Sequence, residues 1–293
     1  MDLTGRLVIV TGASSGLGRA IALRLAIHEG ADVILAARRV ERLEELATAI
    51  AAKAPARGTV HSRPGVAYVC EVDLALPDGP QTLMNRALEI AESRAVERGR
   101  SDGLFGLVNN AGVTHYGPVV EMGSSQLERI INLNVRATMD LTRRFVRELS
   151  RRETGGAVLT ITSLAAHVPV PYQAAYAASK HALQAYMNSL AFELDHRASR
   201  GSSEFVITCF APGGVATEMI TNSGLQSRFS DSAGGNPDRF LAPADTVAAQ
   251  ALRAWRRRRR ASTGGLANHL TLLASRLLPL GWIGRASERL FRP

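Results

Sequence analysis

The chain has 293 residues and a formal net charge of +9, from 35 Lys and Arg against 26 Asp and Glu. This length is enough for one large or two modest domains with a buried core, and aliphatic residues abound while aromatic residues make up 5%. The composition excludes a largely disordered chain and favours an α/β protein. No apolar stretch approaches the roughly 20 residues that cross a bilayer, so we expect no membrane-spanning helix.

Three local features bear on the compartment and on partners. Met1 leads straight into a strand pattern without a basic, apolar leader, so we expect no secretory signal and a cytoplasmic protein. Cys70 and Cys209 lie inside apolar runs far apart in the chain, which indicates reduced core residues. Much of the positive charge gathers near the C-terminus, above all at residues 256–260. Such a block suits nucleic acid, anionic lipid or plain solvent.

Apolar runs alternate with helical patterns along most of the chain. We predict strands at residues 7–11, 33–37, 66–72, 104–109, 157–162 and 205–210. We predict helices at residues 18–28, 41–52, 81–97, 125–150, 174–196 and 246–255. Strand followed by helix, repeated, predicts an α/β fold with a Rossmann-like, doubly wound parallel sheet and helices on both faces.

Three segments lack such a pattern. Residues 54–65 and 93–103 are polar or contain Pro and Gly, and we interpret both as surface insertions. Residues 213–243 form a longer irregular stretch rich in Gly, Ser, Asp and Asn, which suits a mobile lid over a substrate.

A glycine-rich turn follows the first predicted strand, with Gly12, Gly16 and Gly18 before a helix begins. Glycine lets the backbone turn tightly and approach phosphate oxygens, and the free N–H groups at a helix start stabilise negative charge. The placement between a strand and a helix therefore predicts the pyrophosphate site of a dinucleotide. The alternative is that these glycines serve only the geometry of the turn.

The second predicted strand runs into Arg38 and Arg39, at the point where an acidic residue would bind the 2′-hydroxyl of NAD. No carboxylate is present there, and a planar, permanently charged guanidinium suits a 2′-phosphate. This segment predicts NADP(H) as the cofactor. The alternative is that both arginines are solvated at the start of the next helix.

Candidate catalytic side chains follow the fourth and fifth predicted strands. Tyr176 and Lys180 are four residues apart on a predicted helix, so the phenol and the ammonium share one face. A nearby cation favours the phenolate and moves the phenol pKa toward neutrality, where a general acid or base works best. Ser163 closes a strand at the edge where doubly wound sheets bind ligands. Asn134 lies mid-helix among apolar residues, an unfavourable place for an amide. The structural alternatives are an amphipathic helix, a turn cap and a satisfied amide.

Together these motifs resemble the short-chain dehydrogenase/reductase family over roughly residues 5–255. The resemblance rests on several segments that occur in the right order. They are the turn at residues 11–18, Asp73-Leu74, Asn109-Asn110-Ala111-Gly112, Asn134, Ser163, the Tyr-Ala-Ala-Ser-Lys segment at residues 176–180, and Pro212-Gly213 with Thr217. Chance agreement of the whole set is very improbable.

The resemblance implies that Tyr176 protonates a carbonyl oxygen as hydride leaves the nicotinamide, or deprotonates an alcohol in reverse. It implies that Lys180 lowers the pKa of Tyr176 and binds the nicotinamide ribose, that Ser163 orients the carbonyl, and that Asn134 supports a proton-relay water. The implied cofactor site consists of Tyr176 and Lys180 together with Gly12, Ser14, Ser15, Gly16, Leu17, Gly18, Arg38, Arg39, Asp73, Leu74, Asn110, Ala111, Gly112, Pro212, Gly213, Val215 and Thr217. Arg38, with Ser14 or Arg39, is implied at the 2′-phosphate, and no metal is implied.

The chain departs from the family pattern after residue 255. Where a short apolar seventh strand is usual, the sequence has five consecutive arginines, which puts that strand in doubt. We therefore divide the chain into a dinucleotide-binding domain, residues 1–255, and a basic, amphipathic helical extension, residues 256–293. The extension suits a membrane interface, and the alternatives are packing on its own domain or on a second subunit. Its leucines near helical spacing are Leu266, Leu270, Leu273, Leu277, Leu278 and Leu280.

The leading hypothesis is reversible hydride transfer between NADP(H) and a ketone or secondary alcohol, in the direction of reduction. Apolar residues after Ser163 and in the expected lid, such as Met219 and Leu225, favour a lipophilic ketone, either a keto-lipid or a steroid-like molecule. The alternatives are a 3-oxoacyl-thioester reductase of fatty-acid or polyketide type and a non-catalytic NADP-binding scaffold. Nucleic-acid binding is disfavoured because no recognition motif accompanies the basic block. We also expect a homodimer or a larger homo-oligomer.

Overall fold

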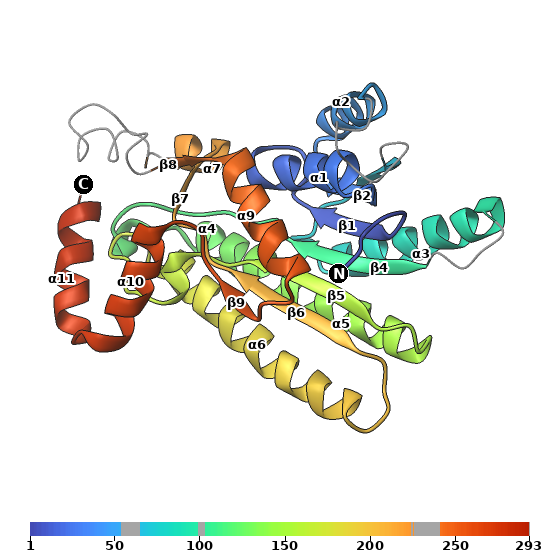
Figure 1. Cartoon of the computed structure of the whole chain (residues 1–293). Helices are drawn as coiled ribbons and strands as arrows, with labels where there is room; N and C mark the ends of the chain where they lie inside the picture. Colours follow the sequence, from blue (N-terminus) through green and yellow to red (C-terminus); the bar gives the residue numbers. More distant parts are fainter. Residues whose placement is uncertain (54–64, 99–102, 224, 226–240, 293) are drawn as a thin grey trace.

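The computed structural model describes residues 1–53, 65–98, 103–223, 225 and 241–292. At its centre is a parallel sheet of seven strands in the order β3-β2-β1-β4-β5-β6-β9 (Figure 1). The strands are β1 (Leu7–Thr11), β2 (Asp32–Ala37), β3 (Ala67–Glu71), β4 (Leu104–Asn109), β5 (Gly156–Ile161), β6 (Phe205–Phe210) and β9 (Ala261–Ser262). The strand order reverses between β1 and β4, which is the place where a sheet of this kind leaves a crevice for a ligand.

Helices cover both faces of the sheet, as the two layers in Figure 1 show. One face carries α1 (Gly16–His28), α2 (Val40–Ala51) and α9 (Ala244–Arg256). The other carries α3 (Gly79–Arg98), α5 (Thr138–Arg151) and α6 (Ala174–Ala198). Successive strand side chains point to opposite faces, so Val8 and Val10 pack under the first layer while Leu7 and Ile9 pack under the second. Burial on both faces explains why the strands are continuous apolar runs.

This architecture confirms the doubly wound parallel sheet predicted from the sequence. Three predicted strands, at residues 7–11, 104–109 and 205–210, have the observed bounds. The other predicted strands and helices differ from the observed ones by at most two residues at an end, apart from the helix predicted at 125–150.

The doubt about a seventh strand was wrong. β9 pairs with the end of β6, Ala261 beside Cys209 and Ser262 beside Phe210, and the Cys209 N–H donates to the Arg260 carbonyl at 2.7 Å. A strand of two residues has too little apolar sequence to stand out next to five arginines. The sheet therefore extends past residue 255, the boundary expected between domain and extension.

Three of the five arginines at 256–260 form ion pairs with carboxylates elsewhere in the chain. Arg256 pairs with Glu29 at 3.1 Å, Arg258 pairs with Glu204, and Arg260 pairs with Asp195. The Arg260 guanidinium also lies 4.6 Å from the centre of the Phe192 ring. Much of the charge that stands out in the sequence is thus balanced by carboxylates of neighbouring elements.

Residues 93–98 belong to α3, so the expectation of a surface insertion from residue 93 was wrong for this part. The polar sequence is misleading because Arg94, only 1% exposed, is buried as an ion pair with Asp32. The Arg94 Nε donates to Asp32 Oδ2 at 3.0 Å, and Nη2 donates to the Gly5 carbonyl at 2.8 Å. Of the rest of the two expected insertions, only Gly65 and Gly103 are described. Residues 54–64 and 99–102 lie outside the described residues.

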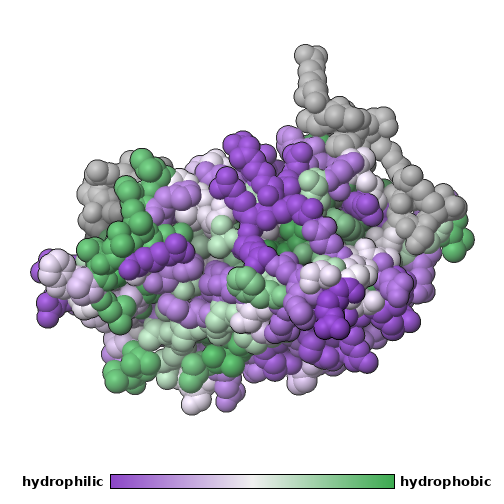
Figure 2. Space-filling view, turned by 60° about the horizontal axis from the view of Figure 1, so that its bottom comes forward, coloured by the Kyte–Doolittle hydropathy of each residue, from purple (hydrophilic) through white to green (hydrophobic). Residues whose placement is uncertain are grey.

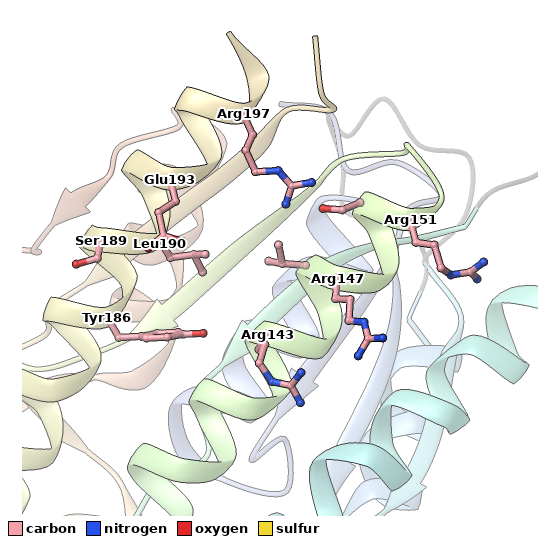
Figure 3. Close-up of a pocket in the computed structure, with 10 residues that line it drawn as sticks. Arg143, Arg147, Arg151, Tyr186, Ser189, Leu190, Glu193 and Arg197 are labelled. Carbon is pink, nitrogen blue, oxygen red and sulfur yellow. The ribbon is translucent and has the colours of Figure 1, made fainter. Parts of the chain in front are cut away.

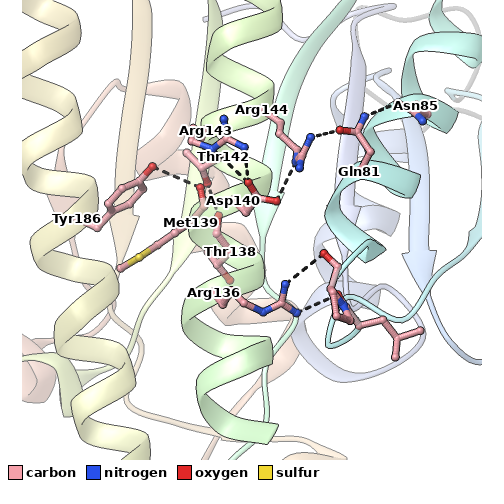
Figure 4. A network of polar contacts seen from close by, with 12 residues as sticks. Gln81, Asn85, Arg136, Thr138, Met139, Asp140, Thr142, Arg143, Arg144 and Tyr186 are labelled. Carbon is pink, nitrogen blue, oxygen red and sulfur yellow. Dashed lines mark hydrogen bonds and ion pairs between the residues drawn. The ribbon is translucent and has the colours of Figure 1, made fainter. Parts of the chain in front are cut away.

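The helix predicted at 125–150 consists of three parts. α4 (Ser124–Ile130) leads into a π-helical stretch, Ile131–Ala137, and then into α5. A polar network holds this region against α3 and the segment after β3 (Figure 4). Asp140 accepts from Arg143 at 2.6 Å and from Arg144 at 2.8 Å, and Arg136 donates to the Ala75 carbonyl at 2.8 Å. The π-helical stretch, a feature often found at functional sites, contains Asn134.

Short elements replace the irregular stretch expected at 213–243 where it is described. They are β7 (Gly214–Ala216), which pairs with β8 (Leu241–Pro243), and α7 (Glu218–Asn222). Residues 224 and 226–240 of the expected lid lie outside the described residues. The extension forms a helical hairpin of α10 (Leu266–Leu277) and α11 (Leu280–Phe291), on the side toward which the carboxyl ends of the strands point (Figure 1).

Candidate active site

A cleft of about 570 Å³ lies at the carboxyl ends of the central strands. It brings together most of the residues that the sequence analysis selected, and they come from seven separate segments. Those that line it are Gly12, Ser14, Ser15, Gly16, Leu17, Arg38, Arg39, Asp73, Leu74, Asn110, Ala111, Gly112, Ser163, Tyr176, Lys180, Pro212, Gly213, Val215 and Thr217. Two selected residues, Gly18 and Asn134, are buried beside the cleft and do not line it.

The glycine turn packs too closely for any other residue. A Cβ on Gly18 would lie 2.3 Å from the Gly12 carbonyl oxygen and 2.4 Å from the Asn110 Nδ2. Gly16 has a φ of 53°, in the left-handed region, and a Cβ there would meet the Thr217 side chain at 2.9 Å. Because the first turn of α1 has no acidic residue, its free N–H groups face the cleft without a competing carboxylate.

Thr11 joins this turn to the segment after β4. Its hydroxyl donates to the Val108 carbonyl at 3.1 Å and accepts from the backbone N–H groups of Asn110, at 2.9 Å, and Ala111, at 3.1 Å. The Asn110 side chain donates back to the Thr11 carbonyl at 3.0 Å. The two walls of the crevice between β1 and β4 are thus held at a fixed separation.

Two arginines stand at the mouth of the cleft, after β2. The Arg39 Nη2 donates to the hydroxyls of Ser14 at 3.1 Å and Ser15 at 2.9 Å, and its Nη1 pairs with Glu218 at 2.8 Å. Both hydroxyls belong to the glycine turn, so Arg39 joins the end of β2 to that turn. Arg38 lies 3.7 Å from the Asp73 carboxylate. Each of the two arginines at this end of the cleft is thus paired with a carboxylate.

The other end of the cleft holds the phenol of Tyr176. Burial raises its pKa above the ordinary value, and a hydrogen bond with the Ser163 hydroxyl opposes this rise. The Ser163 Oγ also accepts from the Ala165 N–H at 3.1 Å, which fixes the hydroxyl at the start of the loop after β5. Tyr176 and Ser163, expected to act together, are therefore in direct contact.

Lys180 lies one helical turn beyond Tyr176. Its Nζ donates to the Ile161 carbonyl at 3.0 Å and lies 5.7 Å from the centre of the Tyr176 ring. Burial lowers the pKa of Lys180 to about 8, because an ammonium is poorly solvated there. The expected lowering of the Tyr176 pKa by Lys180 is not seen in the protein by itself, where burial is the larger influence.

Asn134 is fully engaged within the protein. Its Oδ1 accepts from the Val113 N–H at 2.9 Å, and its Nδ2 donates to the Val113 carbonyl at 2.9 Å and to the Ser179 hydroxyl at 3.0 Å. These bonds connect the π-helical stretch to the loop after β4 and to the helix of Tyr176. A position for Asn134 in proton transfer stays a prediction.

An apolar group lies beside Tyr176, outside the lining of the cleft itself. Tyr176 packs with Ala165, Val168, Val170 and Ala177, and the hairpin adds Ile283 and Phe291 to this group. Phe291 also contacts a second group formed by Leu225, Leu241, Tyr116 and Ile220. The His115 Nε2 lies buried at this end of the cleft and finds no hydrogen-bond partner among the described residues.

A second hollow, of about 520 Å³, lies between α5 and α6 (Figure 3). It is lined by Arg143, Val146, Arg147, Ser150, Arg151, Tyr186, Ser189, Leu190, Glu193 and Arg197. The two hollows are similar in volume, so chemistry has to decide between them. In the second there is no glycine turn or lysine, and its phenol, on Tyr186, donates to the Met139 carbonyl at 3.3 Å. We therefore assign the candidate active site to the first cleft.

Sequence reasoning missed several residues of the first cleft and its rim. Thr11 was quoted only as part of the glycine turn, although it joins two segments. Glu218 and Tyr116 had no local signal, because their partners Arg39 and Phe291 lie about 175 residues away in the chain. Such contacts between distant segments become visible only in the fold.

Comparison with known proteins agrees with this geometry. The short chain dehydrogenase family matches residues 6–227. The chain belongs to this family of oxidoreductases. Its members act on CH–OH and C=O groups with a nicotinamide cofactor.

Individual relatives are distant. The chain is 32% identical over 221 residues to dehydrogenase/reductase SDR family member 7B of Bos taurus, a match that covers 74% of this chain and 60% of that protein. It is 31% identical over 220 residues to NADPH-dependent aldehyde reductase 2, chloroplastic, of Arabidopsis thaliana, covering 74% and 75%. A short-chain dehydrogenase from Sphingobium yanoikuyae in complex with NADPH shares the fold, with a TM-score of 0.72, 24% identity and coverage of 92% and 93%.

Proposed function

We propose that this oxidoreductase is an NADP(H)-dependent carbonyl reductase or alcohol dehydrogenase that reduces a lipophilic ketone. The observation that carries the proposal is the contact between Tyr176 and Ser163 in a cleft that also holds a glycine turn, two arginines and the apolar side chains of Val113, Met219 and Ile220. A proton donor, apolar side chains and an anion-binding turn in one cleft are the parts that reduction of a lipophilic carbonyl by a dinucleotide needs.

The cleft fits a dinucleotide by its own geometry. The glycine turn leaves a cradle that Cβ atoms would fill, and the N-terminal N–H groups of α1 are free for a pyrophosphate. Ser14, Ser15 and Thr217 would hold the phosphates, and Lys180 would donate to the nicotinamide ribose. When bound, the nicotinamide would supply or accept the hydride.

Tyr176 then supplies the proton. Because burial raises its pKa, the phenol is protonated at neutral pH, the form that can donate to a carbonyl oxygen. The Ser163 hydroxyl holds the same oxygen in line with the phenol. The reduced product is an alcohol, and the phenolate left behind is stabilised by the ammonium of Lys180. In reverse, the phenolate accepts the alcohol proton.

NADP(H) is the cofactor that the arginines favour. No carboxylate ends β2, and Arg38 and Arg39 stand there with the Ser14 hydroxyl within hydrogen-bond distance of Arg39. A 2′-phosphate at this place would take the contacts that Arg39 makes with Glu218. The plant relative whose name describes an NADPH-dependent aldehyde reductase supports the same cofactor.

A cofactor test follows from this arrangement. Arg38→Ala and Arg39→Ala should each lower the preference for NADPH over NADH about 10- to 100-fold, the usual worth of a charge-assisted hydrogen bond. Dissociation constants for both cofactors, measured by fluorescence, give the ratio. A wild-type protein that binds both equally, with a ratio unmoved by either substitution, would contradict the NADP(H) assignment.

The catalytic test uses NADPH oxidation against lipophilic ketones, small ketones, aldehydes and 3-oxoacyl thioesters. Tyr176→Phe should keep cofactor affinity and lose turnover, by at least about 100-fold if the phenol is the acid. Tyr186→Phe, on the same helix but in the second hollow, is the matched control and should keep full activity. Turnover of thioesters alone would favour the alternative of a 3-oxoacyl-thioester reductase. Tight NADPH binding by the wild type with no turnover of any compound would favour a non-catalytic scaffold.

The setting of the protein is part of the proposal. We place it in the cytoplasm, in contact with a membrane through the extension, in lipid metabolism, and as a homodimer or larger homo-oligomer. Cys70 and Cys209 are both free and buried, which agrees with a reducing compartment.

A further inference from the structure

The α10–α11 hairpin has an inner face that packs on the cleft. The Tyr116 hydroxyl donates to the Phe291 carbonyl at 2.8 Å, and Phe291 and Ile283 pack on the apolar group around Tyr176. On α10, Asn268 approaches the loop after β6, where its Oδ1 lies 2.6 Å from the place a Cβ on Gly213 would take. The hairpin is thus seated at the substrate end of the cleft.

Its outer face is exposed and apolar. The structure describes 15 exposed large hydrophobic side chains, and seven of them fall in the short span of residues 266–282. These seven are Leu266, Leu270, Leu273, Leu277, Leu278, Leu280 and Trp282, with exposed fractions between 46% and 77%. We call them the leucine stripe. Figure 2 shows hydrophobic side chains gathered at the left of the molecule, the side on which Figure 1 places the hairpin.

The charge around the leucine stripe has one sign. Residues 266–292 contain four arginines, at 276, 285, 289 and 292, and a single acid, Glu288, which pairs with Arg292 at 2.5 Å. Arg276 and Arg285 are both exposed, and neither forms an ion pair with a carboxylate in the part of the chain that the structure describes. A surface that complements this face is therefore apolar and negatively charged.

We infer that the leucine stripe docks on the surface of a membrane that contains anionic phospholipid. Exposed leucine and tryptophan with arginine beside them is the composition of helices that lie in the membrane interface. None of the described helices combines the length and apolar character that crossing a bilayer requires. A second copy of the chain fits less well, because a two-fold contact would bring together two hairpins that both carry net positive charge.

Docking would place the substrate end of the cleft next to the lipid. The same hairpin whose outer face meets the membrane packs Ile283 and Phe291 against the apolar group beside Tyr176. A ketone dissolved in the bilayer could then reach the cleft with little exposure to water. This consequence rests on the proposed function, whereas docking itself can be measured without turnover.

The first experiment is flotation with vesicles of phosphatidylcholine alone or with a quarter of phosphatidylglycerol. Wild-type protein should float with the anionic vesicles, and the triple variant Leu270→Ser, Leu273→Ser, Leu277→Ser should bind at least about tenfold more weakly, from the apolar area removed. Leu76→Ser with Val120→Ser, two exposed apolar residues outside the hairpin, is the matched control and should bind as wild type. Unchanged NADPH affinity shows that the triple variant is folded.

Three outcomes would overturn the inference. Wild type could stay unbound on both kinds of vesicle, or the triple variant could float as well as wild type. Light scattering could show a dimer that the triple variant converts to a monomer while neither protein floats, which would identify a second copy as the occupant. If the wild-type protein binds the vesicles but reduces no ketone embedded in them, the result contradicts the proposed function and leaves the docking inference standing.

Discussion

The ionisation of Lys180 is open to a direct and quantitative test. Its side chain is only 5% exposed, and burial lowers its pKa from 10.5 to about 8. At about 1.4 kcal/mol for each pKa unit, the folded protein disfavours the ammonium by roughly 3 kcal/mol relative to the unfolded chain. The ammonium still donates a hydrogen bond to the Ile161 carbonyl at 3.0 Å.

The sign of the pH dependence follows from proton binding. Between about pH 8 and 10.5 the unfolded chain keeps this proton and the folded protein loses it, so the free energy of unfolding rises with pH by about 1.4 kcal/mol per unit. The contribution is fully present above 10.5 and is lost as the pH falls through 8. Lys180→Met removes this titration. The free energy of unfolding of wild type, relative to that of the variant, should therefore rise by up to roughly 3 kcal/mol between pH 8 and 10.5.

Urea unfolding at a series of pH values measures this difference. Lys53→Met is the matched control, because Lys53 is exposed and is the only other lysine of the chain, and its difference from wild type should stay flat. With two lysines, carbon NMR of the methylated side chains also reads the Lys180 pKa directly. A pKa near 10.5, or a wild-type curve parallel to that of Lys180→Met, would refute the reasoning. Because Lys180 loses its charge above about pH 8, NADPH affinity should fall above this pH if binding needs the charged form.

Three further predictions concern the scaffold and the acid. Arg94→Met leaves the buried Asp32 carboxylate without its ion-pair partner and should lower the free energy of unfolding in urea by about 3 to 5 kcal/mol. Arg86→Met, at an exposed ion pair, is the control and should lower it by under about 1 kcal/mol. Equal losses would contradict the importance of the buried charge pair. Gly18→Ala places a Cβ against the Gly12 carbonyl and should abolish NADPH binding in a fluorescence titration, so binding as tight as wild type would show that the turn can adapt. Because burial raises the Tyr176 pKa, alcohol oxidation should speed up about tenfold per pH unit from 7 to 9 while reduction stays level; oxidation that is flat in steady-state assays would mean that the phenolate is already formed at pH 7.

Much of the fold and of the cleft was predictable, because both depend on local patterns. The strands are buried on both faces and therefore continuous, and the glycine turn carries its own sequence signal between β1 and α1. The same holds for Tyr176 and Lys180, whose spacing fixes a shared helix face. Sequence reasoning failed where a weak or misleading local signal met a contact with a distant segment. Ala261 joins the sheet only because β6 offers an open edge, and Arg94 is buried only because Asp32 lies opposite.

The surroundings of Tyr176 show the same limit. Its hydrogen bond with Ser163 agrees with the expected pairing, but the pKa directions of Tyr176 and Lys180 depend on burial, which the sequence does not display. Asn134 was recognised as an unusual residue in a helix, yet its three bonds to Val113 and Ser179 required the fold. Spacing predicts which side chains meet, while solvation decides how they ionise.

The position of the hairpin after the last strand has a consequence for how this protein can change. The sheet is complete at Ser262, and the hairpin, residues 266–292, is attached to the cleft by apolar contacts and by a bond from Tyr116 to a backbone carbonyl. A backbone acceptor makes no demand on the side chain at that position. The polar contact can therefore persist whatever side chain stands at position 291, and the packing at positions 283 and 291 asks only for apolar side chains, while the glycine turn and Tyr176 stay as they are. The substrate range of such a protein can drift, or be redesigned by exchange of one short segment, without rebuilding the half that handles the cofactor.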